Sequence, residues 1–188
     1  INGSGAQVKA AFDVIDSNGN ATAHITGNDY TIAQLKAINN ATAGAIVLAA
    51  PTANLSGDVA DIVAAFAGSV TTNTGTIEIT DANTTDIQAT DIATINTAIT
   101  GAITVTNTID INGSGSDVAA AFTAIDTNTG NATANVTGTD YTVAQLKTIN
   151  NATTGAIVLA TPTATLSGTV ADIVAAFAVT VTTNTGAV

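Results

Sequence analysis

The chain has 188 residues, a formal net charge of −11, an apolar fraction of 46%, and no Cys, Met or Trp. The absence of cysteine excludes disulfides, thiolate nucleophiles and Cys-ligated zinc or iron–sulfur centres. Only three residues are Lys or Arg, too few for the basic patch of a nucleic-acid-binding protein, and no apolar run approaches the roughly 18 residues of a membrane span.

Short strands are predicted after glycines that recur roughly every 28 residues. After each glycine, apolar residues alternate with mostly polar ones, the period-two pattern of a strand with one buried face. Val47 and Val158 break the alternation, which predicts a strand covered on both sides. The glycines are Gly19, Gly44, Gly75, Gly101, Gly130, Gly155 and Gly186. The alternating residues are Ala21/Ala23/Ile25, Ile46/Leu48, Ile77/Ile79, Ile103/Val105, Ala132/Ala134/Val136 and Ile157/Leu159.

Helices are predicted between these strands, where apolar residues recur at i, i+3, i+4 and i+7 on one helical face. Ser4, Ser114 and Thr90 are expected N-caps. Turns are expected where Asn, Thr and Gly cluster, over 39–44, 71–75 and 127–130, and short extended pieces at Leu55, Ile87, Ile111 and Leu166. The helical sets are Val8/Ala11/Phe12/Ile15, Ile32/Leu35/Ile38, Val59/Ile62/Val63/Phe66, Ile92/Ile95/Ile99, Val118/Ala121/Phe122/Ile125 and Val170/Ile173/Val174/Phe177.

The chain also contains a long internal repeat, with an offset of 110 residues that becomes 111 after the Gly/Asn-rich loop near Gly19. A first long repeat of about four strand–helix coils is therefore predicted over 1–110, and a truncated second repeat over 111–188. The repeated pairs are Ile1–Gly5 with Ile111–Gly115, Tyr30–Lys36 with Tyr141–Lys147 and, unchanged, Val59–Phe66 with Val170–Phe177.

The predicted fold is an α/β solenoid, in which coils of about 28 residues stack into a ladder of parallel strands covered by helices. A single coil cannot bury its own apolar faces, so neighbouring coils are expected to form one continuous solenoid. The alternative is a tandem pair of ordinary globular domains. Since neither end carries a polar capping coil, the parent protein is expected to continue in both directions.

Two turns rich in Asp and Asn are candidates for calcium, because they alternate oxygen ligands as calcium loops do. The second repeat spaces these residues differently, and no Glu stands where it would close the loop. An ordinary Asx-rich turn is therefore the favoured interpretation, calcium binding is the alternative, and no cofactor is expected. The candidates are Asp16, Asn18 and Asn20 in one turn, and Asp81, Asn83 and Asp86 in the other.

Other polar residues are expected to have structural roles. His24, the single histidine, falls on an outward strand position and is interpreted as solvated. Tyr30 and Tyr141 recur before helices, where each ring is expected to cover the apolar seam with its hydroxyl at the surface. Asp61 and Asp172 lie off the apolar helix stripe and are interpreted as solvated helix surface. No carboxylate pair, Ser–His–Asp set or phosphate-binding glycine loop is found, so no enzyme activity is predicted.

Two stretches, DYTVAQLKTINNATTGAIVL at 140–159 and LSGTVADIVAAFA at 166–178, resemble the tandem repeats of very large secreted surface proteins of bacteria, marine cyanobacteria among them. The resemblance implies an extracellular stalk, adhesin spacer, sheath or surface-layer role, and export by type I secretion. Such proteins often carry calcium-binding nonapeptides elsewhere. The Gly-Gly-x-Gly-x-Asp pattern of those nonapeptides is absent here, so the resemblance implies no calcium site in this chain.

The predicted function is a structural rod segment of a large extracellular or cell-surface repeat protein. Its expected partners are further copies of the repeat in the parent chain, and the rods are candidates for association into fibres or layers. The alternative is a binding module whose Thr-bearing strand face or Asp/Asn turns hold glycan, ice or calcium. A solenoid enzyme would place clustered Asp, Lys or Arg on one face, and the sequence lacks such a cluster.

Overall fold

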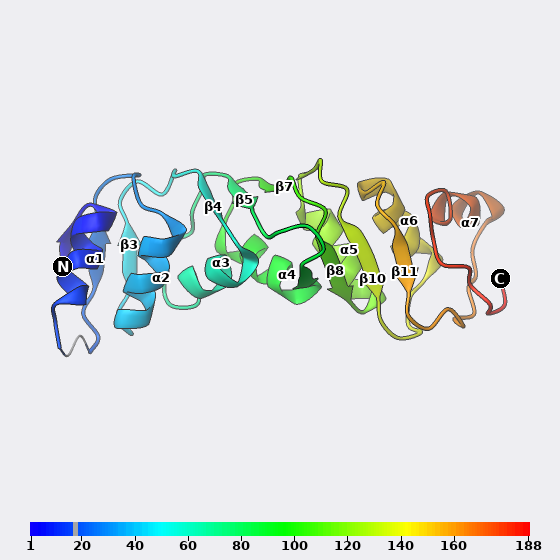
Figure 1. Cartoon of the computed structure of the whole chain (residues 1–188), viewed down its shortest axis with the longest axis horizontal. Coiled ribbons are helices and arrows are strands. Elements are labelled where there is room, and N and C mark those ends of the chain that lie inside the picture. Colours follow the sequence, from blue (N-terminus) through cyan, green and yellow to red (C-terminus); the bar gives the residue numbers. More distant parts are fainter. Residues whose placement is uncertain (17–18) are drawn as a thin grey trace. The chain divides into compact units, whose positions relative to one another are not determined.

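A computed structural model describes residues 1–16 and 19–188 and has a mixed α/β fold (Figure 1). In the described residues, seven helices alternate with short strands, and the strands form three parallel sheets. The helices are α1 (Gly5–Asp13), α2 (Ile32–Ala41), α3 (Val59–Ala65), α4 (Ala89–Ala98), α5 (Gly115–Ala124), α6 (Val143–Ala152) and α7 (Val170–Ala176). The strands are β1 (Asn2–Gly3), β2 (Ala23–Ile25), β3 (Ile46–Leu48), β4 (Leu55–Gly57), β5 (Ile77–Ile79), β6 (Asp86–Gln88), β7 (Ile103–Val105), β8 (Asp110–Gly113), β9 (Thr127–Asn128), β10 (Thr133–Val136) and β11 (Ile157–Leu159).

The chain forms two compact units, which are described separately. Unit 1 comprises Ile1–Thr80 and Thr94–Ile103, and unit 2 comprises Asp81–Ala93 and Thr104–Val188. The prediction of a mixed α/β chain with parallel strands is confirmed, and the stacking of all coils into one solenoid stays a prediction.

In unit 1, helices connect parallel strands, as parallel pairing requires a crossover between the strand ends. Helix α1 joins β1 to β2, and α2 joins β2 to β3. Strand β2 pairs with both of these strands, and in this register His24 lies opposite Asn2 of β1 and Val47 of β3. Helix α3 joins β4 to β5, which pair with Leu55 opposite Ile77. The helices α1, α2 and α3 follow one another as direct neighbours, coloured from blue to cyan in Figure 1.

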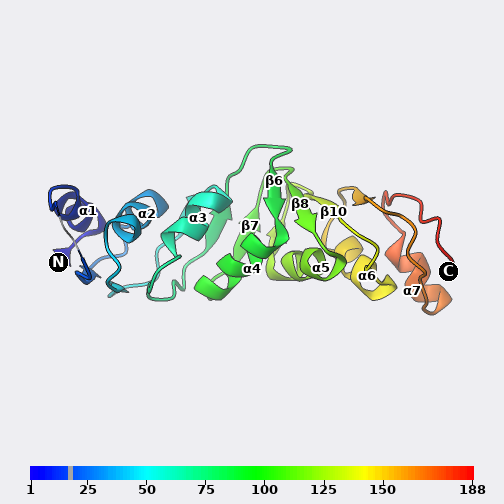
Figure 2. The same ribbon diagram turned by 90° about the horizontal axis from the view of Figure 1, so that it is seen from below.

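Unit 2 has the same kind of connection. Its sheet has the order β11-β10-β8-β6, with α5 joining β8 to β10 and α6 joining β10 to β11. A further parallel pair forms where Thr104 and Val105 of β7 lie opposite Thr127 and Asn128 of β9. Figure 2 shows α5, α6 and α7 on one side of the unit, with β6, β8 and β10 on the other.

The core of each unit lies between the inward strand residues and the apolar stripes of the helices. In unit 1, Ile25 and Leu48 of the strands and Phe12, Leu35 and Ile38 of the helices are buried. Each such side chain contributes about 1.5–3 kcal/mol to the stability of the fold by leaving water. The inward row of the unit 2 sheet is Ile87, Ile111, Ala134 and Ile157.

The strands predicted after six of the seven glycines are confirmed, as β2, β3, β5, β7, β10 and β11, whereas no strand is described after Gly186. The expected extended pieces are also found in β4, β6 and β8, whereas Leu166 belongs to no strand although its N–H donates to the Ala187 carbonyl at 2.7 Å. The turn predicted at 127–130 begins instead with the short strand β9. Val158, predicted to be covered on both faces, is exposed.

The predicted helices are confirmed, and the differences lie at their ends and in α7, where Val170 and Val174 of the predicted apolar face are exposed. Ile15, expected on the buried face of α1, follows the end of that helix and is exposed. Ser4 and Ser114 cap α1 and α5 as predicted, each accepting a hydrogen bond from the backbone N–H three residues later. Thr90 is not a cap, because α4 already begins at Ala89.

Candidate functional site

A buried Tyr–Asn hydrogen bond joins distant segments of unit 1. The Tyr30 hydroxyl donates to Oδ1 of Asn73 at 2.7 Å, and Nδ2 of Asn73 donates to the carbonyls of Ala53 and Gly75 at 3.0 and 3.2 Å. Both side chains are buried. This burial raises the pKa of the Tyr30 hydroxyl, and a hydrogen bond to the Ala53 backbone acts in the opposite direction.

Unit 2 repeats this contact. The Tyr141 hydroxyl donates to Oδ1 of Asn184 at 2.8 Å, and Nδ2 of Asn184 donates to the carbonyls of Ala164 and Gly186 at 3.0 and 3.4 Å. In both units the asparagine follows the tyrosine by 43 residues. The prediction that the rings are buried is confirmed, but the prediction that the hydroxyls lie at the surface is wrong, because each has an internal acceptor. The fixed separation is the sequence signal for this contact, which sequence reasoning missed.

Neighbouring helices are joined by one Lys–Asp ion pair in each unit. Lys36 of α2 pairs with Asp61 of α3 in unit 1, and Lys147 of α6 pairs with Asp172 of α7 at 2.6 Å in unit 2. Hydrogen bonds from Lys147 and then from Thr169 lower the pKa of Asp172. The interpretation of Asp61 and Asp172 as simply solvated is therefore corrected, since each partly exposed carboxylate binds a lysine of the preceding helix.

The remaining amino groups are also engaged. Lys9 pairs with Asp13 at 2.6 Å within α1, and the amino group of Ile1 donates to the Thr22 carbonyl at 2.8 Å. The chain has three Lys and Arg residues in all, so every cationic side chain forms an ion pair with an aspartate. Such exposed pairs contribute little to stability, and two of them, at Lys36 and Lys147, connect neighbouring helices.

Threonine hydroxyls bind backbone carbonyls of the preceding strand–helix segment in both units. Thr42 donates to the Ala21 carbonyl and Thr153 to the Ala132 carbonyl, each at 2.7 Å. Further along, Thr74 and Thr185 donate to the carbonyls of Pro51 and Pro162, each at 2.9 Å. Part of the high threonine content therefore serves contacts inside the units. The use of other threonines for ligand binding stays a prediction.

Six of the recurring glycines lie directly against the backbone of the preceding strand–helix segment. A Cβ atom at Gly75 would come closer than 3.0 Å to the Ala53 carbonyl oxygen, which real Cβ atoms do not do. Only glycine allows this approach. Gly19 differs, since it has a φ of +50° and, among residues 1–16 and 19–188, no atom within 4 Å of the Cβ position. The other five close approaches are at Gly44, Gly101, Gly130, Gly155 and Gly186.

The second calcium candidate, in unit 2, has its side-chain oxygens engaged with other residues. Oδ1 of Asn83 accepts from the N–H of Thr108 at 2.8 Å, and Oδ1 of Asp86 accepts from Nδ2 of Asn112 at 3.0 Å. Asp81, the third residue of this set, is buried. These bonds connect the turn to the next segment of the chain, as an ordinary structural turn does.

The first calcium candidate is only partly described. Asp16 and Asn20 are exposed, and Asn18 lies outside the described residues. Over residues 1–16 and 19–188, no three His, Cys, Asp or Glu side chains are grouped so that they could hold a metal ion, and no helix has the length and apolarity to cross a membrane. Calcium binding at either turn stays the alternative interpretation, and an ordinary turn stays the prediction.

The outward strand faces carry a mixed set of polar residues. His24 is exposed in the middle of β2, where it was expected. In the unit 2 sheet, Asp86 of β6 lies opposite Asp110 of β8. The next outward row of that sheet runs through Gln88, Asn112, Asn135 and Val158, so its residue type changes from strand to strand.

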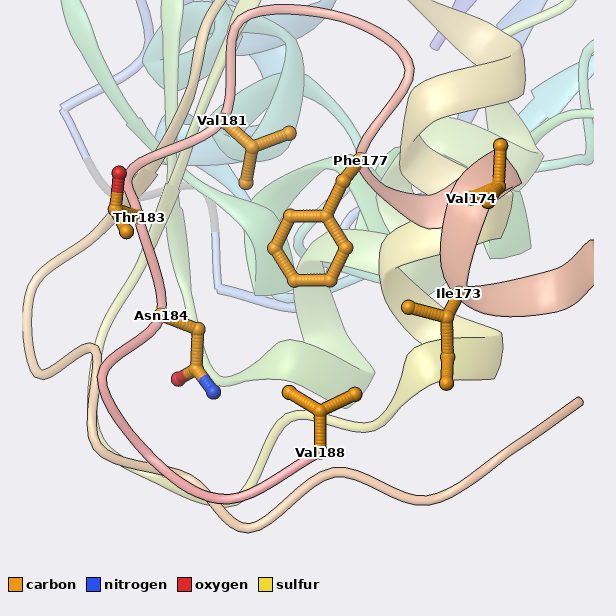
Figure 3. A pocket seen from close by; sticks show the side chains of 7 residues that line it. All are labelled: Ile173, Val174, Phe177, Val181, Thr183, Asn184 and Val188. Carbon is orange, nitrogen blue, oxygen red and sulfur yellow. The ribbon is translucent and has the colours of Figure 1, made fainter. Parts of the chain in front are cut away.

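An apolar depression of about 450 Å³ lies beside α7 in unit 2. Figure 3 shows the Phe177 ring directed into it, with Val181, Ile173 and Val188 around the same space. Val174 and Val188 are exposed there, unlike the apolar residues of the core. The lining residues are Ile173, Val174, Phe177, Val181, Thr183, Asn184 and Val188.

Comparison with known proteins finds no counterpart, since no family model, curated protein or solved structure matches the chain. The function is therefore inferred from contacts that the chain makes twice. These contacts join residues about 20 to 43 positions apart in both units. Chemically, such an arrangement fixes consecutive strand–helix segments against each other.

Proposed function

We propose that the chain is a structural segment of a large extracellular repeat protein, in which coils of about 28 residues stack into one continuous α/β solenoid. The solenoid acts through its length and stiffness, as a rod or spacer in a surface layer, sheath, fibre or adhesin stalk. It performs no catalysis, and its partners are further copies of the same repeat.

The observation that carries this proposal is the recurrence of one set of contacts in both units. The Tyr–Asn bond, the Lys–Asp pair between helices and the threonine-to-carbonyl bond are each formed twice, by corresponding residues. In repeat proteins, stability is approximately the sum of the stabilities of the single repeats and of the contacts between neighbouring repeats. The same set of contacts can therefore hold together an array of any length. Parallel strands joined by helices in both units support the same reading.

The composition supports a location outside the cell. Three Lys and Arg residues in 188 leave few sites for proteases that cleave after basic residues. The net charge of −11 keeps the surface soluble, and salt at seawater strength screens its self-repulsion.

Immunogold electron microscopy of intact source cells tests the proposal. An antibody against the purified chain is expected to label surface fibres, a sheath or a layer outside the cell envelope. Antibody that has been absorbed with the purified chain serves as the control and should give no label. Label confined to the cytosol would overturn the extracellular role and favour binding or scaffolding inside the cell.

A further inference from the structure

A hollow of about 190 Å³ in unit 2 is lined by polar, uncharged side chains, and asparagine is the commonest residue in its lining. It lies at the C-terminal end of α6, between this helix, the stretch from β9 to the start of β10 and the turn that follows α7. Each asparagine amide combines an acceptor oxygen with two donor hydrogens. The lining residues are Asn128, Asn131, Asn150, Asn151, Ala152, Thr153, Thr154 and Val179.

Two of these amides are fixed through their oxygen atoms. Oδ1 of Asn131 accepts from the Thr154 hydroxyl at 2.7 Å, and Oδ1 of Asn150 accepts from the N–H of Val179 at 2.8 Å. Among residues 1–16 and 19–188, the Nδ2 groups of Asn131 and Asn150 have no acceptor. The two groups are therefore donors held in position, and such side chains lose little conformational freedom when a ligand binds.

Hydrogen bonds also join the walls of the hollow. Oδ1 of Asn128 accepts from the N–H of Ala132 at 3.0 Å, and its Nδ2 donates to the Ala152 carbonyl at the end of α6 at 3.3 Å. Thr153 is buried, and its hydroxyl donates to the Ala132 carbonyl at 2.7 Å. The shape of the hollow is thus set by bonds between α6 and the chain before β10.

The charges around the hollow determine which ligands suit it. Its lining has no Lys, Arg or His to bind an anion and no Asp or Glu to bind a cation. The last carbonyls of α6 carry partial negative charge and accept hydrogen bonds, and the net charge of −11 also repels anions. A suitable ligand is therefore neutral, and its polar groups both accept from amide N–H groups and donate to carbonyl oxygens. Hydroxyl groups do both.

We propose that this hollow, here called the asparagine hollow, is a binding site for one neutral sugar ring. The Nδ2 groups of Asn131 and Asn150 donate to ring hydroxyls, and the exposed amide of Asn151 adds a third contact. Val179 and Ala152 supply apolar surface for the C–H groups of the ring. Sites for drug-sized ligands measure about 300–1,000 Å³, so the smaller asparagine hollow suits a single ring better than an oligosaccharide.

Unit 1 does not offer the same set of groups. Nδ2 of Asn39, the counterpart of Asn150, donates to the Ala64 carbonyl at 2.9 Å, so this donor is already used. The counterparts of Thr154 and Val179 are an alanine and a glycine, at positions 43 and 68. Sugar binding is therefore assigned to unit 2, and Asn39 serves as an internal reference.

The direct test records the side-chain amide signals of the isotope-labelled chain by NMR. Titration with D-glucose, D-galactose or D-mannose is expected to shift the Nδ2 signals of Asn131 and Asn150, with a dissociation constant of about 1–10 mM for at least one sugar, and to leave Asn39 unshifted. The anion D-glucuronate should bind at least about tenfold more weakly. An equal shift with D-glucuronate, or no shift with any neutral sugar, would overturn the proposal.

Neutral polysaccharides distinguish two sources of the sugar. Shifts of the same signals with dextran or mannan would support the proposal and identify the ligand as part of a polysaccharide. Shifts with the monosaccharides alone would support it and identify the ligand as a free sugar.

Matched substitutions test the assigned residues. Asn150→Asp keeps an oxygen that accepts from the Val179 N–H but replaces the Nδ2 donor by a charged acceptor, so binding should weaken at least about tenfold. Asn96→Asp makes the same change of charge on the exposed side of α4, outside the lining, and should leave the affinity unchanged. If Asn150→Asp does not fold, Thr154→Ala removes the hydroxyl that holds Asn131 and should weaken binding at least about threefold. Unchanged affinity in a folded Asn150→Asp or Thr154→Ala chain would overturn the assignment.

The outcomes separate this inference from the proposed function, on which it does not depend. Surface label in electron microscopy without sugar binding would overturn the sugar site alone. Sugar binding together with cytosolic label would overturn the extracellular role alone.

Discussion

Among single residues, Asn73 joins several buried polar groups in unit 1. Its amide accepts from the Tyr30 hydroxyl and donates to the carbonyls of Ala53 and Gly75. Tyr30 and Ala53 lie 43 and 20 residues before Asn73 in the sequence, whereas Gly75 lies two residues after it. A side chain with both an acceptor and two donors is needed at this point, which explains why an amide recurs in both units.

Replacement of Asn73 by alanine is expected to lower the free energy of unfolding by about 3 kcal/mol, because the Tyr30 hydroxyl and two carbonyls lose their partner in a site closed to water. The matched control is Asn184→Ala, which removes the same set of bonds from a half-buried site. Water replaces some of those bonds, so this loss should be about 1 kcal/mol. Urea denaturation monitored by circular dichroism measures the free energy of unfolding of both variants. Equal decreases would show that burial of the asparagine does not determine the size of the destabilisation.

The close glycine contacts lead to a second prediction. Gly75→Ala should destabilise the chain by at least about 2 kcal/mol, because the new methyl group meets the backbone of Thr52 and Ala53, which has little room to move. Gly19→Ala is the control, since its methyl group meets open space and only the left-handed backbone conformation, worth about 1–2 kcal/mol, opposes it. A smaller loss at Gly75 than at Gly19 would contradict the packing argument.

Calcium provides a third prediction at this scale. The side chains of Asn83 and Asp86 accept hydrogen bonds from Thr108 and Asn112, so they already have partners without an ion. We therefore expect about 1 mM calcium, roughly a thousandfold above a dissociation constant of about 1 μM, to leave the melting temperature unchanged relative to magnesium. A rise specific to calcium would support the binding-module alternative. Asp86→Asn would then identify which turn is responsible.

Between elements, the ion pair of Lys147 and Asp172 gives the α6–α7 contact a dependence on pH. The pKa of Asp172 is lowered in the folded chain, chiefly by the hydrogen bond from Lys147. The contribution of the pair is thus fully present above the ordinary pKa of an aspartate and is lost as pH falls through the lowered value. Asp172→Asn should be less stable than the unaltered chain at about pH 7, and the two should converge once the pH falls below the lowered pKa of Asp172.

Denaturation at several pH values checks this prediction, with sodium chloride as the control. Because the pair is partly exposed, about 1 M salt should reduce the difference at neutral pH. A difference that persists unchanged in acid would mean that Asp172 acts through packing or through the N-cap contact with Thr169 rather than through its charge.

The elements with the clearest periodicity could be predicted from sequence. The period-two residues form strands and the i, i+3, i+4 sets form helices, because each pattern needs one buried face whatever lies opposite. The same patterns did not predict the structure at Ile15, Leu166 and β9 correctly. Whether these residues form a helix, a strand or a turn depends on contacts with residues distant in the sequence, which a local pattern does not contain.

The contacts of the candidate site were less predictable than the elements. Tyr30 was recognised as a buried ring, but its acceptor is 43 residues away and belongs to no local motif. Gly44, Gly75 and Gly130 were expected in turns, whereas these three and three other recurring glycines also lie so close to a neighbouring backbone that a Cβ atom would not fit. Comparison of the two repeats is the route by which sequence alone would find both features, since each recurs at matching positions.

For the whole molecule, the solenoid and the tandem of globular domains predict different dimensions. A chain with residues 78–188 repeated once after Val188 contains one further long repeat of about four coils. At about 4.8 Å per strand spacing, stacked coils should add about 19 Å to the maximum dimension and leave the cross-section unchanged. A separate globular domain of this size would add about 30 Å, as its radius of gyration is about 13 Å. Small-angle X-ray scattering of the two chains distinguishes the two cases.

The engagement of every lysine has a practical consequence for imaging and labelling. Among the side chains of residues 1–188, aldehyde fixatives and amine-reactive dyes can modify the amino groups of Lys9, Lys36 and Lys147, and each of these already pairs with an aspartate. Attachment of a label to Lys36 or Lys147 therefore breaks the Lys–Asp ion pair between two helices. The rate at which these two lysines are modified, read by mass spectrometry, becomes a measure of how often α2 separates from α3 and α6 from α7.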